Sequence, residues 1–236
     1  VFVKMVMVIM KAMPFFVFAL MAGQIVKAAG SEPDKFTELM KFYLWYGGVV
    51  IAGLITMAFI FYPIIVKIFT GLGFRKFLRS VKDAQITAFS TSSSVATLPV
   101  TMGCLENNLK VSKSTTSFVL PIGATVNMDG TSLYQGIAVV ALAQFHMVDL
   151  SILQQLIIVG TATLASIGAA AIPSAGLILM MVVLESVGLN PLWIAIIFPI
   201  DRILDMCRTV VNVTGDASVA AIIAYSENEI SSVDDL

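Results

Sequence analysis

The side chains with the clearest chemical potential form one polar stripe near the C-terminal end of the chain. Six polar or charged residues recur there at intervals of four, three, one, three and four: Asp201, Asp205, Arg208, Thr209, Asn212 and Asp216. Because a helix completes one turn in 3.6 residues, these six share one face, and the opposite face is apolar. A simpler alternative is an Asp205–Arg208 ion pair that only locks the helix, but it leaves Asn212 and Asp216 without a reason.

A second group of oxygen-bearing residues surrounds Asp129, which is the only Asp, Glu, Lys or Arg between Ser114 and Asp149. Its neighbours offer carbonyl, amide and hydroxyl oxygens: Gly123, Thr125, Asn127, Gly130 and Thr131. Hard oxygen donors suit a small hard cation rather than a transition metal, and we expect the thioether of Met128 to pack. The alternative for Asp129 is a structural aspartate that caps a broken helix.

The composition predicts a membrane protein. The chain has 236 residues, of which 58% are apolar and 12% are charged, with a net charge of −1. Ordinary soluble domains carry about 25% charged residues, so a water-soluble enzyme and a nucleic-acid-binding protein are both disfavoured. Cys104 and Cys207 have neither metal-site nor disulfide-framework spacing. We expect a multi-pass protein of the cell (plasma or inner) membrane, in contact with the lipid bilayer and without an organic cofactor.

The elements that must position these residues begin with two apolar segments. An amphipathic span is expected at about 6–26, a polar external loop at 27–41 and a clear span at 42–69. The loop that follows Phe69 contains four cations that predict a cytoplasmic location: Arg75, Lys76, Arg79 and Lys82. Residues 1–41 therefore form a scaffold-like unit, and the N-terminus, which lacks a signal peptide, predicts a chain that begins inside a larger protein.

The segment 42–225 is predicted to be a transport core built from an internal repeat. Two apolar segments interrupted by small and polar residues, 83–113 and 150–190, predict re-entrant helical hairpins, since each half is too short to cross the hydrocarbon. Each is followed by a span with a polar break: NMDGT in 114–147 and NVTGD in 191–225. Matching interruptions in two halves indicate the binding site of a transporter, although Gly and Pro are also common in ordinary spanning helices. Residues 226–236 form an acidic cytoplasmic tail.

The charges at membrane depth predict the ligand. Asp129, Asp205, Asp216 and Arg208 sum to −2, which bound cations would offset. A ligand amino group could pair with Asp205, and Arg208 could then hold a carboxylate through two hydrogen bonds. Ser93, Ser94 and the backbone N–H groups of the hairpin tips could hold a second carboxylate. The predicted ligand is an acidic amino acid bound together with cations.

At this point the sequence resembles a known family. The segments STSSSVATLPVTM, PIGATVNMDGT, ASIGAAAIPSAG and DMCRTVVNVTGD resemble, in order, the C-terminal half of glutamate/aspartate transporters of the dicarboxylate/amino acid:cation symporter family. The resemblance covers residues 1 to about 225. It implies an all-α membrane protein with an inverted-repeat, elevator-type core, a sodium-coupled symport of aspartate or glutamate, and a homotrimer in the full-length family context.

The resemblance also implies roles for individual residues. Arg208 would hold the side-chain carboxylate and Asp205 the amino group. Further substrate contacts would come from the following residues: Thr131, Thr209, Asn212, Ser93, Ser94, Ile172 and Gly176. One sodium site would use Gly123, Asn127, Asn212 and Asp216. A second would use Thr125, Ser166, Ile167 and Ala169, with Met128 alongside. A third would use Asn127 and Asp129 and needs hydroxyls from a third span.

Three departures from the family pattern accompany the resemblance. Nothing in the chain resembles the first four spans; if this is not a truncation, most of the trimerisation scaffold and part of the third cation site are missing. Val95 and Ala169 stand where some relatives have hydroxyl residues at the hairpin tips. Ser92 and Met206 stand where many relatives carry an extra arginine near the ligand.

Several alternatives stay open at this stage. The same fold could carry a C4 dicarboxylate or a neutral amino acid, but Asp205 argues against the first and Arg208 against the second. Proton coupling could replace sodium, although His146 lies near a span end. A passive channel or an inactive fragment is a further alternative. An intramembrane hydrolase built on the Ser92–Ser94 cluster lacks a base, so no enzyme is predicted.

Overall fold

The computed structural model describes residues 15, 18–19, 22–23, 33–169 and 174–229, and it is helical throughout the elements assigned within them. This agrees with the predicted all-α class. Most of the expected first span, the tip residues 170–173 and the tail 230–236 lie outside the described residues.

The first long helix comprises α2 (Pro33–Thr56), a π-helical turn η1 (Met57–Phe61) and α3 (Tyr62–Thr70). It contains the expected span 42–69. The external loop was predicted to extend to residue 41, but α2 already begins at Pro33. Asp34 in the first turn favours this earlier start through the helix dipole. Within the described residues, 36–70 is the one helix that is long and apolar enough to cross a membrane. Gly71 ends it in the left-handed conformation.

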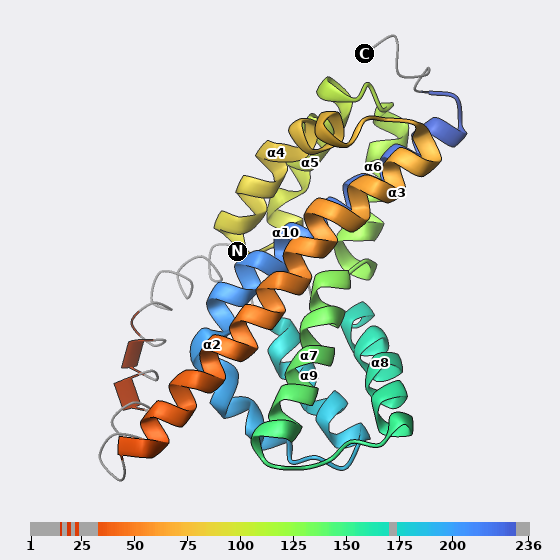
Figure 1. The fold of residues 1–236 in the computed structure, drawn as a ribbon. Helices are drawn as coiled ribbons and strands as arrows, with labels where there is room; N and C mark the ends of the chain where they lie inside the picture. Colours follow the sequence, from red (N-terminus) through yellow and green to blue (C-terminus); the bar gives the residue numbers. More distant parts are fainter. Residues whose placement is uncertain (1–14, 16–17, 20–21, 24–32, 170–173, 230–236) are drawn as a thin grey trace, which may run out of the picture.

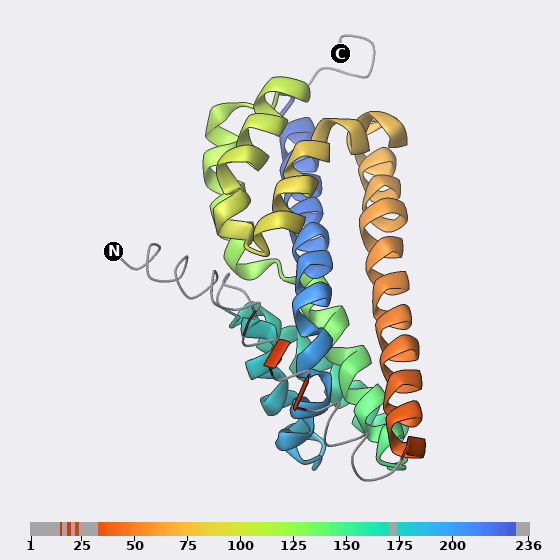
Figure 2. The same ribbon diagram turned by 90° about the vertical axis from the view of Figure 1, so that its left-hand side faces the viewer.

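Two helix pairs follow along the chain. The helices α4 (Phe74–Thr91) and α5 (Ser94–Asn108) pack together and are joined at Ser92, whose φ of 51° turns the chain. The helices α8 (Ile152–Ile167) and α9 (Ala175–Ser186) pack together in the same way. The helices α4 and α8 each end toward the middle of the molecule (Figures 1 and 2).

The basic segment after Phe69 is helical, not a loop as predicted. The helix α4 begins at Phe74, and its buried Phe77 and Val81 alternate with exposed cations on an amphipathic surface. Burial of one apolar face therefore stabilises a helix where the charge content indicated a loop.

The two polar pentapeptides have different conformations. The first interrupts a span as predicted: α6 (Lys113–Val126) ends at Asn127, and α7 (Asp129–Phe145) begins two residues later. The second does not, because α10 runs unbroken from Ile194 to Ser226 after a short 3-10 turn η2 (Pro191–Trp193). The prediction of a broken last span was wrong. A Cβ at Gly215 would lie 2.8 Å from the Tyr62 hydroxyl and 2.9 Å from Asn127 Nδ2, so this glycine permits close packing rather than a break.

The helix α10 is the central helix of the fold. It packs against α2, α3, α4, α5, α6, α7 and α9, and in Figure 2 it runs through the middle of the molecule, with α4–α6 around one end and α7–α9 around the other. At 33 residues it is roughly 50 Å long. Its middle, which carries the polar stripe, therefore lies where the two helix pairs and the α6–α7 break meet.

Glu229, just beyond α10, links the end of this helix to the start of α6 through hydrogen bonds. Its Oε1 accepts hydrogen bonds from Ser112 Oγ and Thr115 Oγ1, each at 2.7 Å, and its Oε2 accepts one from the Ser112 N–H at 3.1 Å. The bonds from Ser112 and then Thr115 lower the pKa of Glu229 because they favour the ionised carboxylate.

We expect Glu229→Gln to lower the free energy of unfolding by about 1 kcal/mol, as loss of a helix cap does. Because the folded-state pKa is lowered, the contribution of Glu229 is present at neutral pH and is lost as the pH falls through that pKa. Thermal unfolding in detergent at several pH values measures both effects. Glu227→Gln, a change at an exposed neighbour, is the control, and equal effects of the two substitutions would contradict the assignment.

Candidate functional site

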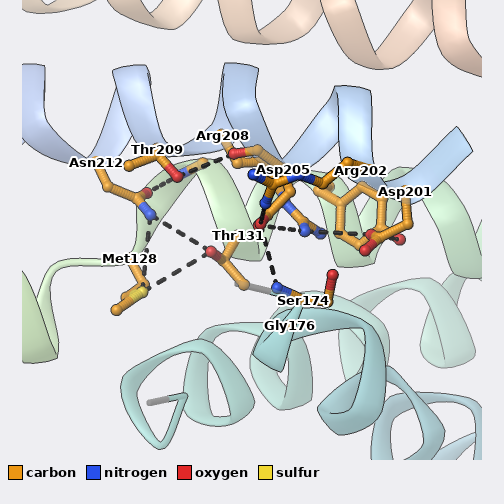
Figure 3. A network of polar contacts seen from close by, with 12 residues as sticks. Met128, Thr131, Ser174, Gly176, Asp201, Arg202, Asp205, Arg208, Thr209 and Asn212 are labelled. Carbon is orange, nitrogen blue, oxygen red and sulfur yellow. Dashed lines mark hydrogen bonds and ion pairs between the residues drawn. The ribbon is translucent and has the colours of Figure 1, made fainter. Parts of the chain in front are cut away.

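Arg208 is the centre of a buried ion-pair cluster on α10. Its side chain is 1% exposed, and its Nη2 lies 2.6 Å from Asp205 Oδ1 and 3.2 Å from Asp201 Oδ1. The guanidinium also stacks over Tyr134 of α7, with Cζ 3.8 Å from the ring centroid, and the Tyr134 hydroxyl donates to Asp201 at 2.8 Å. Figure 3 shows these groups converging between α10 and α7. The position of Arg208 is thus fixed by two carboxylates and one aromatic face.

Part of the Arg208 guanidinium has no protein partner. Its Nε and Nη1 are buried and make no hydrogen bond to any residue that the structure describes. A buried donor without a partner costs free energy, and charged donors cost more than neutral ones. Each of these two nitrogens can therefore donate a hydrogen bond to an acceptor that enters from outside the cluster, such as a carboxylate oxygen.

The tip between α8 and α9 lies directly against this cluster. The Ser174 N–H donates to Asp205 Oδ2 at 3.1 Å, and Gln135 Nε2 of α7 donates to the Gly176 carbonyl at 2.8 Å. A Cβ on Gly176 would lie 2.6 Å from Thr131 Cγ2 and 3.5 Å from Arg208 Nη1. The backbone at the start of α9 thus contacts Asp205, and Gly176 allows α9 to lie close to Thr131 and Arg208.

A second polar group lies one to two turns further along α10. Asn212 accepts a hydrogen bond from the Gly130 N–H at 2.8 Å through its Oδ1, and its Nδ2 faces Thr131 Oγ1 at 3.4 Å and Met128 Sδ at 3.7 Å. Thr209 Oγ1 donates to the Asp205 carbonyl at 2.9 Å. Asn212 therefore binds the start of α7, and Met128 packs against polar groups rather than in an apolar core.

Two further carboxylates lie near the α6–α7 break. Asp216 is 4% exposed, accepts a hydrogen bond from Asn127 Nδ2 at 3.0 Å, and lies so close to Gly123 that a Cβ there would be 2.5 Å from its Oδ1. Asp129 accepts a hydrogen bond from the hydroxyl of Tyr62 on α3. Within the described ranges no Lys or Arg forms an ion pair with either carboxylate.

This donor set suits a sodium ion. It contains carboxylate and amide oxygens, which are hard ligands, and within the described ranges its two carboxylates form no ion pair with Lys or Arg. No cluster of three or more His, Cys, Asp or Glu that could bind a metal occurs in the described part of the chain.

The remaining predicted residues lie on neighbouring elements. Ser93 caps α5 by accepting a hydrogen bond from the Ala96 N–H at 3.2 Å, and Ser94 is buried. Ile172 lies outside the described residues. The proposed second sodium set is at the ends of α6 and α8, where Ser166 and Ala169 are buried and Thr125 and Ile167 are exposed. The roles of these residues in binding stay predictions.

Sequence reasoning missed the roles of four residues: Tyr62, Tyr134, Gln135 and Asp201. The role missed for Asp201 is that of an ion-pair partner of Arg208. A signal was available for the tyrosines, since a tyrosine hydroxyl in an apolar segment needs a hydrogen-bond partner when it is buried. Asp201 stood in the predicted stripe but received no role.

Comparison with known proteins adds two findings. The family model described as "Sodium:dicarboxylate symporter family" matches residues 1–226. An excitatory amino acid transporter of Caenorhabditis elegans is 42% identical over 100% of this chain and 46% of its own length. Excitatory amino acid transporter 2 of Mus musculus is 42% identical over 98% of this chain and 40% of its own length, and the values for excitatory amino acid transporter 3 of Homo sapiens are 41%, 98% and 43%. The chain thus spans less than half the length of these relatives.

Proposed function

Because the chain belongs to the sodium:dicarboxylate symporter family, we propose that it forms the substrate- and cation-binding part of a secondary active transporter for aspartate or glutamate. The family is one of transporters, which agrees with the prediction that the chain is not an enzyme. The related excitatory amino acid transporters support an acidic amino acid as the substrate.

The observation that carries this proposal is the partly satisfied guanidinium of Arg208 beside Asp205. A ligand carboxylate would accept a hydrogen bond from Nη1 or Nε, which have no partner among the described residues, and the ligand ammonium would bind Asp205. A C4 dicarboxylate has no ammonium for Asp205, and a neutral amino acid has no side-chain carboxylate for Arg208. The geometry therefore favours aspartate or glutamate over both alternatives.

Sodium would offset the charge that the protein leaves unpaired. One sodium would bind near the α6–α7 break, at Gly123, Asn127, Asn212 and Asp216. A second would bind at Thr125, Ser166, Ile167 and Ala169, with Met128 alongside, and a third at Asn127 and Asp129. Bound cations would also fix the α6–α7 break, from which Thr131 and Met128 reach the substrate groups. Binding of sodium and substrate would thereby be coupled through shared elements.

The two helix pairs would act as re-entrant hairpins that close over the substrate. Ser93 and Ser94 would contribute from the α4–α5 tip, and Ile172 and Gly176 from the α8–α9 tip, which would be the gate because Ser174 and Gly176 already contact the substrate groups. Residues 42–225 would move as a unit across the bilayer, and a homotrimer would form in the full-length context.

We expect aspartate to raise the melting temperature of the purified chain only when sodium is present. At 100 times its dissociation constant a ligand stabilises by about 2.7 kcal/mol. Thermal unfolding with aspartate, glutamate, succinate or serine, each in sodium or choline chloride, measures this. Stabilisation by succinate but not aspartate would contradict the substrate, and sodium-independent stabilisation that follows pH would favour proton coupling.

A further inference from the structure

Tyr62 occupies a position in the cation region that the family pattern does not explain. It is buried at the start of α3, and its hydroxyl donates to the carboxylate of Asp129 at the start of α7. The resemblance implies that a cation at Asp129 is also bound by hydroxyls from a third span. Tyr62 places a hydroxyl at that carboxylate from within the chain.

The helix that carries Tyr62 is irregular at this point. The π-helical turn Met57–Phe61 ends immediately before it. A π turn adds one residue to an α-helix, rotates all that follows, and occurs frequently at functional sites. The turn therefore sets which face of α3 meets Asp129, and it places Tyr62 on that face.

The neighbouring helix leaves room for the phenol. A Cβ on Gly215 of α10 would lie 2.8 Å from the Tyr62 hydroxyl and 2.9 Å from Asn127 Nδ2. The hydroxyl and the amide thus converge over one glycine, next to Asp216, which accepts a hydrogen bond from the same amide. Tyr62, Asn127, Asp129 and Asp216 form one group of oxygen-bearing side chains from α3, the α6–α7 break and α10.

We propose that the hydroxyl of Tyr62 is a ligand of the cation that binds at Asp129. A tyrosine hydroxyl can donate one hydrogen bond and can also present lone pairs. Without the cation it donates to Asp129 and compensates part of that half-buried charge. When the cation binds, the hydroxyl turns its oxygen to the ion and completes a set of hard oxygen ligands. This inference rests on the proposed function, since it deepens the sodium site.

The test is Tyr62→Phe, which removes the oxygen and keeps the ring. We expect the sodium concentration that gives half-maximal thermal stabilisation, measured without any amino acid, to rise about tenfold, as loss of one interaction with a charged group predicts. Tyr43→Phe is the matched control, because the Tyr43 hydroxyl donates to the Ile196 carbonyl at 2.7 Å in another part of the molecule. An unchanged sodium midpoint in Tyr62→Phe would overturn the inference.

A second measurement covers the case in which Tyr62→Phe does not fold. Sodium titration of the wild-type chain should change the near-ultraviolet absorption of tyrosine, since one phenol exchanges a hydrogen-bond acceptor for an ion. A wild-type chain that sodium stabilises without any tyrosine difference signal would overturn the assignment of Tyr62. Sodium stabilisation that aspartate does not increase would contradict the proposed function while leaving the role of Tyr62 supported or overturned by its own readout.

Discussion

Arg208→Ala should abolish stabilisation by aspartate and also destabilise the chain without ligand. Removal of the guanidinium takes from Asp201 and Asp205 their shared partner at 3.2 and 2.6 Å, and leaves Asp205 only the longer contact with Arg202 at 3.7 Å. Breaking a buried ion pair by deleting one partner costs about 3–5 kcal/mol. Thermal unfolding with and without aspartate separates the two effects. The loss of the ion pairs lowers the melting temperature in every condition, and the loss of aspartate binding removes the shift that aspartate causes.

Two further variants make this prediction specific. Arg208→Lys keeps the charge and loses the planar group, so it should recover part of the stability but little of the aspartate affinity. Arg202→Ala is the matched control, because Arg202 Nη1 lies 3.7 Å from Asp205 Oδ2, beyond hydrogen-bond distance, and its side chain is 24% exposed against 1% for Arg208. We expect this longer and more exposed pair to contribute about 1 kcal/mol. If Arg202→Ala removed aspartate binding as completely as Arg208→Ala, the assignment of Arg208 would be wrong.

Gly130→Ala should separate α7 from α10 and disturb the substrate and cation groups together. A Cβ at this position would lie 2.6 Å from the backbone oxygen of Arg208 and 3.0 Å from Asn212 Oδ1. Backbone cannot move aside as a flexible side chain can, so we expect a loss of about 2–3 kcal/mol in the free energy of unfolding. The hydrogen bond from the Gly130 N–H to Asn212 would also lengthen.

Gly136→Ala on the same helix is the control. No atom lies within 4 Å of a Cβ built there, and alanine is favoured over glycine in a helix by about 1 kcal/mol. The two substitutions add the same methyl group to α7, so unfolding measurements should show opposite signs. Equal destabilisation by both would contradict the assignment of the Gly130→Ala effect to contact with α10.

The parts of the site that could be predicted from the sequence are those that depend on local spacing. The polar stripe of α10 follows from a 3.6-residue period, and Asp201, Asp205, Arg208, Thr209, Asn212 and Asp216 are all buried. The interruption at Asn127 follows from residues that compete with helical hydrogen bonds. Both features are set within a few residues of each other along the chain.

The parts that could not be predicted depend on distant partners. The pentapeptide 212–216 resembles the one that breaks at Asn127, but it stays helical because Gly215 packs against Tyr62 and Asn127. The hydroxyls of Tyr62 and Tyr134 each bind an aspartate 67 residues away. A tyrosine in an apolar segment indicates that its hydroxyl needs a partner but not which residue that partner is, and spacing alone does not show that Arg208 is shared by two carboxylates.

The central place of α10 also has a consequence for biosynthesis. The chain is made from its N-terminus, so α2 to α7 leave the ribosome before the surface on which they pack exists. Gln85, for example, donates a hydrogen bond to Thr214 of α10, and Tyr62 packs against Gly215 of α10. Until synthesis passes residue 226 these side chains cannot make their contacts with α10, and in the nascent chain lipid, water or chaperones contact them instead. Completion of the last helix is therefore the event that commits the whole chain to its fold.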